Sequence, residues 1–217
     1  MRGAAGVRRG GLGCGSRWGG MTMYAPQRLC GGKVCLRPIE PRDLDRLWHL
    51  RRDRELGLLV GNLDVPTLEQ WRRIYSRNPW DYGGDPNDLA SFVIVLPQED
   101  VAIGMIGLRW SALPHHAAEL SMWLGKPYWG QGYGTDAIRV LLRYAFRELG
   151  LHKIFLRVLV SNTRAIRCYE KCGFKREGLH RQELYVGGQW HDLIYMGLLA
   201  SEYQEAAASE PLVSHTT

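Results

Sequence analysis

The segment with the clearest chemical potential covers residues 128–135, Tyr-Trp-Gly-Gln-Gly-Tyr-Gly-Thr. Glycines 130, 132 and 134 alternate here with larger residues, between an expected strand at 117–124 and an expected helix. Because glycine has no Cβ, the chain can turn tightly and approach a ligand, while the first N–H groups of the helix point at an anion. The pattern predicts a phosphate-binding loop. The alternative is a tight strand-to-helix turn without a ligand.

Two other phosphate-binding motifs are excluded for this loop. No Gly-Lys-Ser/Thr follows the glycines, so the segment is not a P-loop. Gly130 and Gly132 supply only the first half of the G-x-G-x-x-G pattern of dinucleotide-binding folds. The glycines therefore predict an anion site of another kind.

A carboxylate in the preceding strand is the candidate general base. Glu119 interrupts an apolar run, and a carboxylate in such a place is costly unless it is paired or used. The two-residue period of a strand puts His115 and Ser121 on the same face, so either one is a candidate assistant. The alternative is a structural carboxylate that forms an ion pair with Arg109 or Arg157.

The cysteines and histidines indicate neither a disulfide framework nor a metal site. The chain has five cysteines, and an odd number argues against a disulfide framework. Cys168 and Cys172 lie four apart on an expected helix without a second pair of ligands, so they are expected to be buried small hydrophobes. His191 and Asp192 are adjacent in an expected strand and face opposite sides, which excludes a dyad.

Composition indicates one ordinary globular domain. The chain has 217 residues, 45% of them hydrophobic and 23% charged, with a net charge of +6. No run approaches the roughly 18 apolar residues of a membrane span. Residues 1–22 form a Gly/Arg-rich leader that is expected to be disordered. Either it is an Arg-rich transit peptide, or translation starts at Met21 or Met23, and a cytoplasmic location is expected.

The elements that must position the loop and the carboxylate alternate between strands and helices. We expect a single domain at 33–200 and a frayed tail at 201–217. Apolar periodicity and turn signals predict strands at 33–39, 90–96, 101–110, 116–124, 153–160, 179–186 and 190–199. Capping signals predict helices that begin at Pro41, at Leu68, after the glycine loop, and at Arg164. This order predicts an α/β fold with a mixed sheet.

Two segments together resemble the GCN5-related N-acetyltransferase (GNAT) superfamily, and within it the branch that acetylates ribosomal-protein amino termini. They are Tyr-Trp-Gly-Gln-Gly-Tyr-Gly-Thr-Asp-Ala at 128–137 and Asn-Thr-Arg-Ala-Ile-Arg-Cys-Tyr-Glu-Lys-Cys-Gly-Phe at 162–174. The resemblance covers about three quarters of the chain. It implies a central mixed, mostly antiparallel sheet of about seven strands, flanked by helices and splayed between strands four and five.

One residue departs from the superfamily pattern. That pattern has Gln or Arg, two residues, Gly, one residue, and Gly or Ala, whereas Trp129 stands at the first position here, followed by Gly132 and Gly134. A tryptophan there is similar to the amino-terminal acetylating branch. It removes one polar partner, so main-chain N–H groups must supply more of the binding to a diphosphate.

The resemblance implies acetyl-coenzyme A as co-substrate and no metal. The coenzyme-binding residues that it implies are Met122, Leu124, Trp129, Gly130, Gln131, Gly132, Tyr133, Gly134, Thr135 and Asn162. The implied catalytic residues are Tyr169, as the acid that protonates the departing thiolate, and Glu119 with Ser121 on the base side. Two of these residues have simpler alternatives, because Asn162 can be a helix cap and Tyr169 a packing aromatic.

The expected activity is acetyl transfer from acetyl-coenzyme A to a primary amine, by direct attack in a ternary complex. The leading acceptor is a protein amino terminus; a polyamine, an aminoglycoside-like amine or an amino sugar comes next. One alternative is an acyl-coenzyme A-binding module without catalysis, and another is a nucleic-acid binder that uses the basic leader. Neither a membrane nor a nucleic acid is an expected partner, and a homodimer is left open. Residues 56–66 and 78–88 and the closing hairpin, formed by the strands at 179–186 and 190–199, are expected to face the acceptor.

Overall fold

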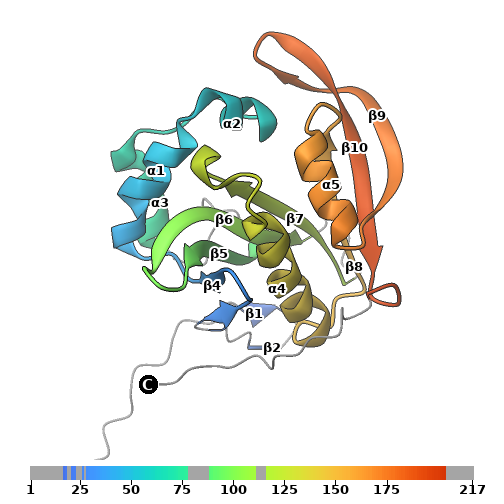
Figure 1. Ribbon diagram of the computed structural model, residues 1–217, viewed down its shortest axis with the longest axis horizontal. Coiled ribbons are helices and arrows are strands. Elements are labelled where there is room, and N and C mark those ends of the chain that lie inside the picture. Colours follow the sequence, from blue (N-terminus) through green and yellow to red (C-terminus); the bar gives the residue numbers. More distant parts are fainter. Residues whose placement is uncertain are drawn as a thin grey trace, which may run out of the picture.

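A computed structural model describes residues 17–18, 21–22, 26, 28–77, 88–110 and 116–203 of the chain. Its centre is an eight-stranded sheet in the order β3-β4-β5-β6-β7-β8-β10-β9 (Figure 1). The strands of this sheet are β3 (Leu29–Cys30), β4 (Cys35–Arg37), β5 (Asp88–Leu96), β6 (Val101–Trp110), β7 (Ala117–Leu124), β8 (Lys153–Leu159), β9 (Lys175–Val186) and β10 (Gln189–Leu199). A separate pair joins β1 (Arg17–Trp18) to β2 (Met21–Thr22).

Helices connect and cover these strands. They are η1 (Pro41–Asp43), α1 (Leu44–Arg51), α2 (Arg54–Leu59), α3 (Leu68–Arg77), η2 (Lys126–Tyr128), α4 (Tyr133–Arg147) and α5 (Thr163–Lys171). None of the helices within the described ranges is long and apolar enough to cross a membrane. The expected mixed α/β fold is confirmed, with eight strands in the main sheet instead of about seven.

The sheet has a hydrophobic core on each face. Phe92 and Ile94 of β5 belong to the core that includes residues of α4 and α5, whereas Val93 and Val95 belong to the core that includes α1 and α3. This division follows from the two-residue period of a strand. In Figure 1, α4 lies across the sheet, and α1 and α3 lie together beside it.

The sheet opens between β7 and β8. These strands form the one parallel pair among the described strands, and they pair only between residues 117–119 and 153–155. Each strand continues beyond this point, β7 to Leu124 and β8 to Leu159. The resemblance predicted a splay between the fourth and fifth strands of the domain, which are β7 and β8 here, and the register agrees with it.

Local sequence signals mark where several helices begin or end. Thr67 and Gln70 form a reciprocal capping box at the start of α3, with bonds of 3.2 Å and 2.8 Å. The Asn162 side chain accepts from the N–H of Ala165 at 3.2 Å and so caps α5. Gly150, which follows α4, has φ +62°, a conformation that favours glycine.

The structure corrects three sequence expectations. The loop expected after α1 contains α2, which Asp53 caps by accepting from Leu56 N–H at 2.9 Å. A short strand, β3, precedes β4, and Cys30 of β3 forms a disulfide with Cys35 of β4 although the odd cysteine count argued against a disulfide framework. Antiparallel pairing places these two cysteines opposite each other, which cysteine counting does not detect.

Some predicted features lie outside the described residues. These are residues 78–87 of the expected acceptor loop, His115, most of the leader and the tail from residue 204. Asp88 belongs to β5 instead of the loop that was expected to contain it.

Candidate active site

A cleft of about 770 Å³ lies where β7 and β8 separate. Glu119 and Ser121 of β7 line it, as do Met122 and Leu124, whose side chains point to the opposite face of the strand. The cleft therefore passes through the gap in the sheet. Segments from α2, the glycine loop, α5 and the β9–β10 hairpin form its walls.

The glycine loop leaves the start of α4 open to a ligand. Gly130 and Gly132 have φ of +76° and +85°, which side chains rarely adopt, and a Cβ on Gly130 would have no atom within 4 Å. Gly132 is the N-cap of α4, and no side chain caps the helix there. No side chain of the described residues therefore accepts from the main-chain N–H groups in the first turn of α4, beside the cleft. An anion-binding site needs N–H groups that are available in this way.

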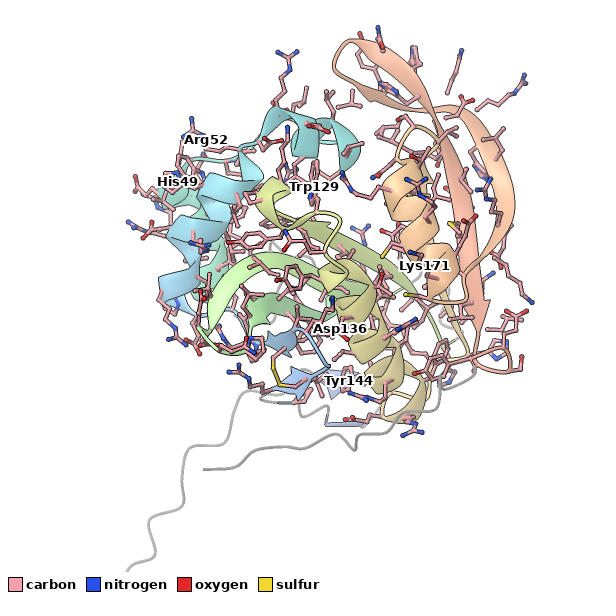
Figure 2. All side chains as sticks on the ribbon, in the orientation of Figure 1. His49, Arg52, Trp129, Asp136, Tyr144 and Lys171 are labelled. Atoms are coloured by element: carbon pink, nitrogen blue, oxygen red, sulfur yellow. A yellow bond between two sulfur atoms is a disulfide. The ribbon has the colours of Figure 1, made fainter. Side chains whose placement is uncertain are left out.

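Cationic residues surround this helix terminus. Arg164, Arg167 and Lys171 of α5 line the cleft, and the Lys33 Nζ donates to the carbonyl of Gln131 at 3.0 Å. In Figure 2, Trp129 in the loop, Asp136 at the start of α4 and Lys171 on α5 are labelled around this region. Together with the helix dipole, these charges favour a polyanion such as a diphosphate.

Trp129 fixes the glycine loop to the end of β7. Its indole Nε1 donates to the carbonyl of Leu124 at 2.7 Å, and the Arg164 guanidinium lies 3.6 Å from the centre of its ring. This cation–π contact joins the loop to α5. Trp129, which departs from the superfamily pattern, therefore holds the glycine loop in position against β7 and α5. It also occupies one lone pair of the carbonyl of Leu124, a residue that the resemblance assigned to coenzyme binding.

Tyr169 reaches the cleft from α5. Its side chain is 7% exposed, lines the cleft and packs edge-on against Phe174, with ring centroids 5.9 Å apart. Burial raises the pKa of the Tyr169 hydroxyl well above its usual range, and the neighbouring Cys168 and Cys172 raise it further. Tyr169 thus stays protonated at neutral pH, as a proton donor must.

Glu119 forms two ion pairs. Its Oε1 lies 2.7 Å from Nε of Arg157, and its Oε2 lies 3.2 Å from Nη2 of Arg109. These are the two arginines named as structural partners from the sequence. An ionised carboxylate offers about four lone-pair sites, so the two ion pairs leave sites on both oxygens.

Most candidate residues meet at this cleft. Its lining includes Glu119, Ser121, Met122, Leu124, Trp129, Gly130, Gly132, Gly134, Thr135, Asn162 and Tyr169. Gln131 and Tyr133 are not among the lining residues. The Gln131 amide donates instead to the carbonyl of Pro127 at 2.8 Å, and the ring of Tyr133 lies against Tyr128.

Sequence reasoning missed the position of Cys168 in the cleft lining. It was expected to be a buried hydrophobe, but it is half-buried and lines the cleft, with Sγ 3.2 Å from Oγ1 of Thr135. The neighbouring Cys172, with Thr135, Lys171 and Arg139, lowers the pKa of the Cys168 thiol to about 7, against the opposite effect of burial. The sequence signal that could have indicated this position is the pair Cys168 and Cys172, four residues apart on the helix of the second family segment.

Asp136 connects the start of α4 to the segment after β3. Its carboxylate accepts from the main-chain N–H groups of Lys33 at 2.7 Å, Val34 at 3.0 Å and Gly32 at 3.3 Å. These bonds hold Lys33 beside the glycine loop. Charge-assisted bonds of this kind are among the stronger ones in proteins.

We therefore expect Asp136→Ala to lower the free energy of unfolding by about 1–3 kcal/mol, because three N–H groups lose their acceptor. Urea denaturation measures the change. Asp64→Ala is the control, since Asp64 is exposed and its hydrogen bond to Asn62 Oδ1 uses the main-chain N–H, which alanine keeps. Equal stability of the two variants would contradict a role for this contact.

Comparison with known proteins agrees with the fold. The family model described as "Acetyltransferase (GNAT) domain" matches residues 33–175. The protein named "Putative ribosomal N-acetyltransferase YdaF" from Bacillus subtilis (strain 168) is 31% identical over 182 residues, covering 79% of this chain and 93% of its own. The spermidine N(1)-acetyltransferase of Vibrio cholerae is 29% identical over 171 residues, covering 79% of this chain and 95% of its own.

A solved structure extends this similarity to three dimensions. Spermidine N-acetyltransferase from Vibrio cholerae in complex with CoA and spermine aligns with a TM-score of 0.69 and 28% identity, covering 78% of this chain and 97% of that one. The family model alone matches well over half of the chain. The chain therefore belongs to the GNAT acetyltransferase family and is an N-acetyltransferase that uses acetyl-coenzyme A.

Proposed function

We propose that this enzyme acetylates the primary amine of a protein amino terminus or of a small molecule, by direct attack in a ternary complex. The observation that carries the proposal is the single cleft that joins the open start of α4 to Tyr169 and Glu119 through the gap between β7 and β8. A coenzyme at one end and an amine at the other can meet in that gap. The names of the relatives, ribosomal and spermidine N-acetyltransferases, support an amine acceptor.

The residues present fit acetyl-coenzyme A, which supplies an activated acetyl thioester when bound. A diphosphate suits the uncapped N–H groups that follow Gly132, and the cations of α5 suit its charge. A Cβ on Gly134 would lie 3.3 Å from Met122 Cε and 3.6 Å from Cys168 Sγ, so this glycine lets the start of α4 pack closely against β7 and α5. Beyond Glu119, β7 does not pair with β8. The main-chain N–H and C=O groups on that side of β7 can therefore form hydrogen bonds with a linear ligand.

The chain's own residues then have distinct tasks. Tyr169, which burial keeps protonated, donates a proton to the leaving sulfur. Glu119 accepts a proton from the attacking amine through a lone pair that its ion pairs leave, and Ser121 lies exposed beside it as an assistant. Asn162 lines the cleft while capping α5.

The experiment that tests the function incubates the purified chain with acetyl-coenzyme A and a panel of amines, with acetylated products detected by mass spectrometry. An enzyme yields a product with at least one class of amine. A catalytically inactive acyl-coenzyme A-binding module binds the coenzyme and yields none, so this result would overturn the proposal.

Glu119→Gln tests the assignment of the base. We expect kcat/KM to fall by about 10²-fold or more, because the amide cannot accept the proton. Steady-state kinetics with the acetylated amine measure the change. Glu177→Gln is the matched control, since Glu177 also forms an ion pair, at 2.7 Å from Lys153, but does not line the cleft. An unchanged kcat/KM for Glu119→Gln would restrict Glu119 to holding Arg109 and Arg157.

A further inference from the structure

A disulfide closes a turn of the chain beside the start of α4. It joins Cys30 of β3 to Cys35 of β4, which lie opposite each other in the antiparallel pair of these strands. Figure 2 shows it as a yellow bond between two sulfur atoms. The chain between the two cysteines is Gly-Gly-Lys-Val, and the N–H of Gly31 donates to the carbonyl of Val34 at 2.9 Å. Residues 31–34 thus form a compact segment, the disulfide-closed turn.

The disulfide-closed turn binds the first turn of α4 through its main chain. The Asp136 carboxylate accepts from three successive N–H groups, those of residues 32, 33 and 34, at 3.3 Å, 2.7 Å and 3.0 Å. Successive N–H groups converge on one anion only while the backbone keeps a concave conformation. The conformation of the disulfide-closed turn and the position of the first turn of α4 therefore depend on each other.

Gly31 lets the disulfide-closed turn come this close to Asp136. A Cβ on Gly31 would lie 2.6 Å from Oδ2 and 2.8 Å from Oδ1 of Asp136, so a side chain there would displace the carboxylate from the three N–H groups. A Cβ on the adjacent Gly32 would meet no atom of the described residues within 4 Å. The close approach thus depends on position 31, and the neighbouring glycine offers a matched control.

The disulfide-closed turn also contacts the glycine loop. The Lys33 Nζ donates to the carbonyl of Gln131 at 3.0 Å, and a Cβ on Gly132 would lie 3.2 Å from this Nζ. Gln131 and Gly132 directly precede α4, so the turn supports both parts of the expected diphosphate site, the loop and the helix terminus. None of the residues of the turn is among the described residues that line the cleft. The turn therefore supports the site from outside the cleft.

Hydrogen bonds hold β3 beside the turn only weakly. The strand is two residues long, pairs with β4 at Leu29 and Cys30, and lies at the edge of the eight-stranded sheet. Its Cys30 carbonyl also accepts from Nη2 of Arg143 on α4 at 2.9 Å. A crosslink restricts the conformations open to the chain that it closes. Without the disulfide, the turn must lose more conformational entropy before its N–H groups can meet Asp136.

We propose that the disulfide-closed turn is a positioning element for the coenzyme, and that reduction of the Cys30–Cys35 disulfide weakens binding of the coenzyme diphosphate. The inference rests on the proposed placement of the diphosphate at the start of α4. N–H groups that are fixed before the ligand arrives bind it better, because binding then costs less ordering. In the reduction, a dithiol gives two electrons and two protons to the two sulfurs, which become thiols, and the dithiol closes to a cyclic disulfide.

The test titrates the full chain, oxidised or reduced, with acetyl-coenzyme A and with S-acetylpantetheine, which lacks the diphosphate. Neither ligand has a free thiol, so neither reduces the disulfide. The reduced chain is prepared with dithiothreitol and freed of it under argon, and alkylation with mass spectrometry verifies the state of Cys30 and Cys35. We expect reduction to raise the Kd of acetyl-coenzyme A by about 3- to 10-fold, because the ordering that the disulfide supplies is lost. The Kd of S-acetylpantetheine, measured by competition, should stay within about twofold, because this ligand does not use the diphosphate site.

The double variant Cys30→Ser/Cys35→Ser removes the disulfide without a reductant. It is expected to bind acetyl-coenzyme A with the Kd of the reduced chain, and dithiothreitol should not change that Kd. The variant keeps every other cysteine, so its insensitivity to dithiothreitol locates the effect at this disulfide. Circular dichroism confirms that the variant is folded at the temperature of the titration.

Gly31→Ala tests the same contact while the disulfide stays intact. The added Cβ displaces the Asp136 carboxylate, so the Kd of acetyl-coenzyme A is expected to rise by about 3- to 10-fold, as on reduction. Gly32→Ala is the matched control, because its Cβ has open space and should leave the Kd within about twofold. Neither glycine has a positive φ, so alanine fits the backbone at both positions.

The outcomes separate the inference from the function on which it rests. If the oxidised and reduced chains bind acetyl-coenzyme A equally well, or if Cys30 and Cys35 stay free thiols after oxidation, the inference is wrong and the acetyltransferase function stands. An equal loss of affinity for S-acetylpantetheine, or equal Kd values for the two glycine variants, likewise overturns the positioning role. If the oxidised chain binds acetyl-coenzyme A no better than S-acetylpantetheine, the placement of the diphosphate fails and the inference fails with it.

Discussion

Replacing Tyr169 with phenylalanine is expected to lower kcat by about 10²- to 10⁴-fold, the usual contribution of a general acid. Tyr169 lines the cleft, and burial raises the pKa of its hydroxyl so that it keeps its proton at neutral pH. Phenylalanine preserves the ring that packs against Phe174. The KM of acetyl-coenzyme A should therefore change little while the chemical step slows.

A second buried tyrosine provides the control for this variant. Tyr144 of α4 is 3% exposed, packs edge-on against Phe92, and has a pKa that burial raises to about 12. It does not line the cleft. Steady-state kinetics of Tyr144→Phe should match the unmodified enzyme. If Tyr169→Phe also kept its full kcat, Tyr169 would be a packing aromatic, as the simpler interpretation of its helix face holds.

Replacing Gly132 with valine is expected to raise the Kd of acetyl-coenzyme A by about tenfold or more. Gly132 has φ +85° at the N-cap of α4, and a β-branched residue there is an outlier that costs about 1–2 kcal/mol. The loop can relieve this strain by moving, which misaligns the N–H groups of the first turn. A shift of 1.4 kcal/mol in binding corresponds to a factor of ten.

Gly188→Val separates this effect on binding from a loss of stability. Gly188 has φ +82°, almost the same conformation, but it lies in the turn between β9 and β10 and does not line the cleft. Both variants should lose similar stability in thermal unfolding, and only Gly132→Val should lose affinity in a titration with acetyl-coenzyme A. Equal affinities would mean that the loop conformation does not support binding.

Much of the fold could be predicted because its signals are local. The start expected for α3, at Leu68, and the bounds expected for β6, residues 101–110, are those observed, since capping and apolar periodicity depend on residues close in sequence. The helix α2 was missed because Gly57 and Gly61 suggested a loop. Buried Leu56 and the cap at Asp53 nevertheless stabilise a short helix there.

The site residues could be predicted where they lie within a sequence motif. The glycine loop, Asn162 and Tyr169 all lie in the two segments that carry the family resemblance, and the structure brings them to one cleft. The cation–π contact between Trp129 and Arg164 joins residues from different elements, so no spacing in the sequence reveals it. The same holds for the ion pairs that Glu119 forms with β6 and β8. Arginines could be named there as candidate partners, but their number and geometry required the sheet register.

The account depends most on the main-chain N–H groups of residues 130–135 binding the diphosphate of the coenzyme. Calorimetric titration with coenzyme A and with pantetheine, which lacks the diphosphate, tests this directly. Saturable binding of coenzyme A at one site per chain, at least about tenfold tighter than that of pantetheine, is the predicted result. Equal affinities for the two ligands, or no saturable binding of coenzyme A, would contradict the account.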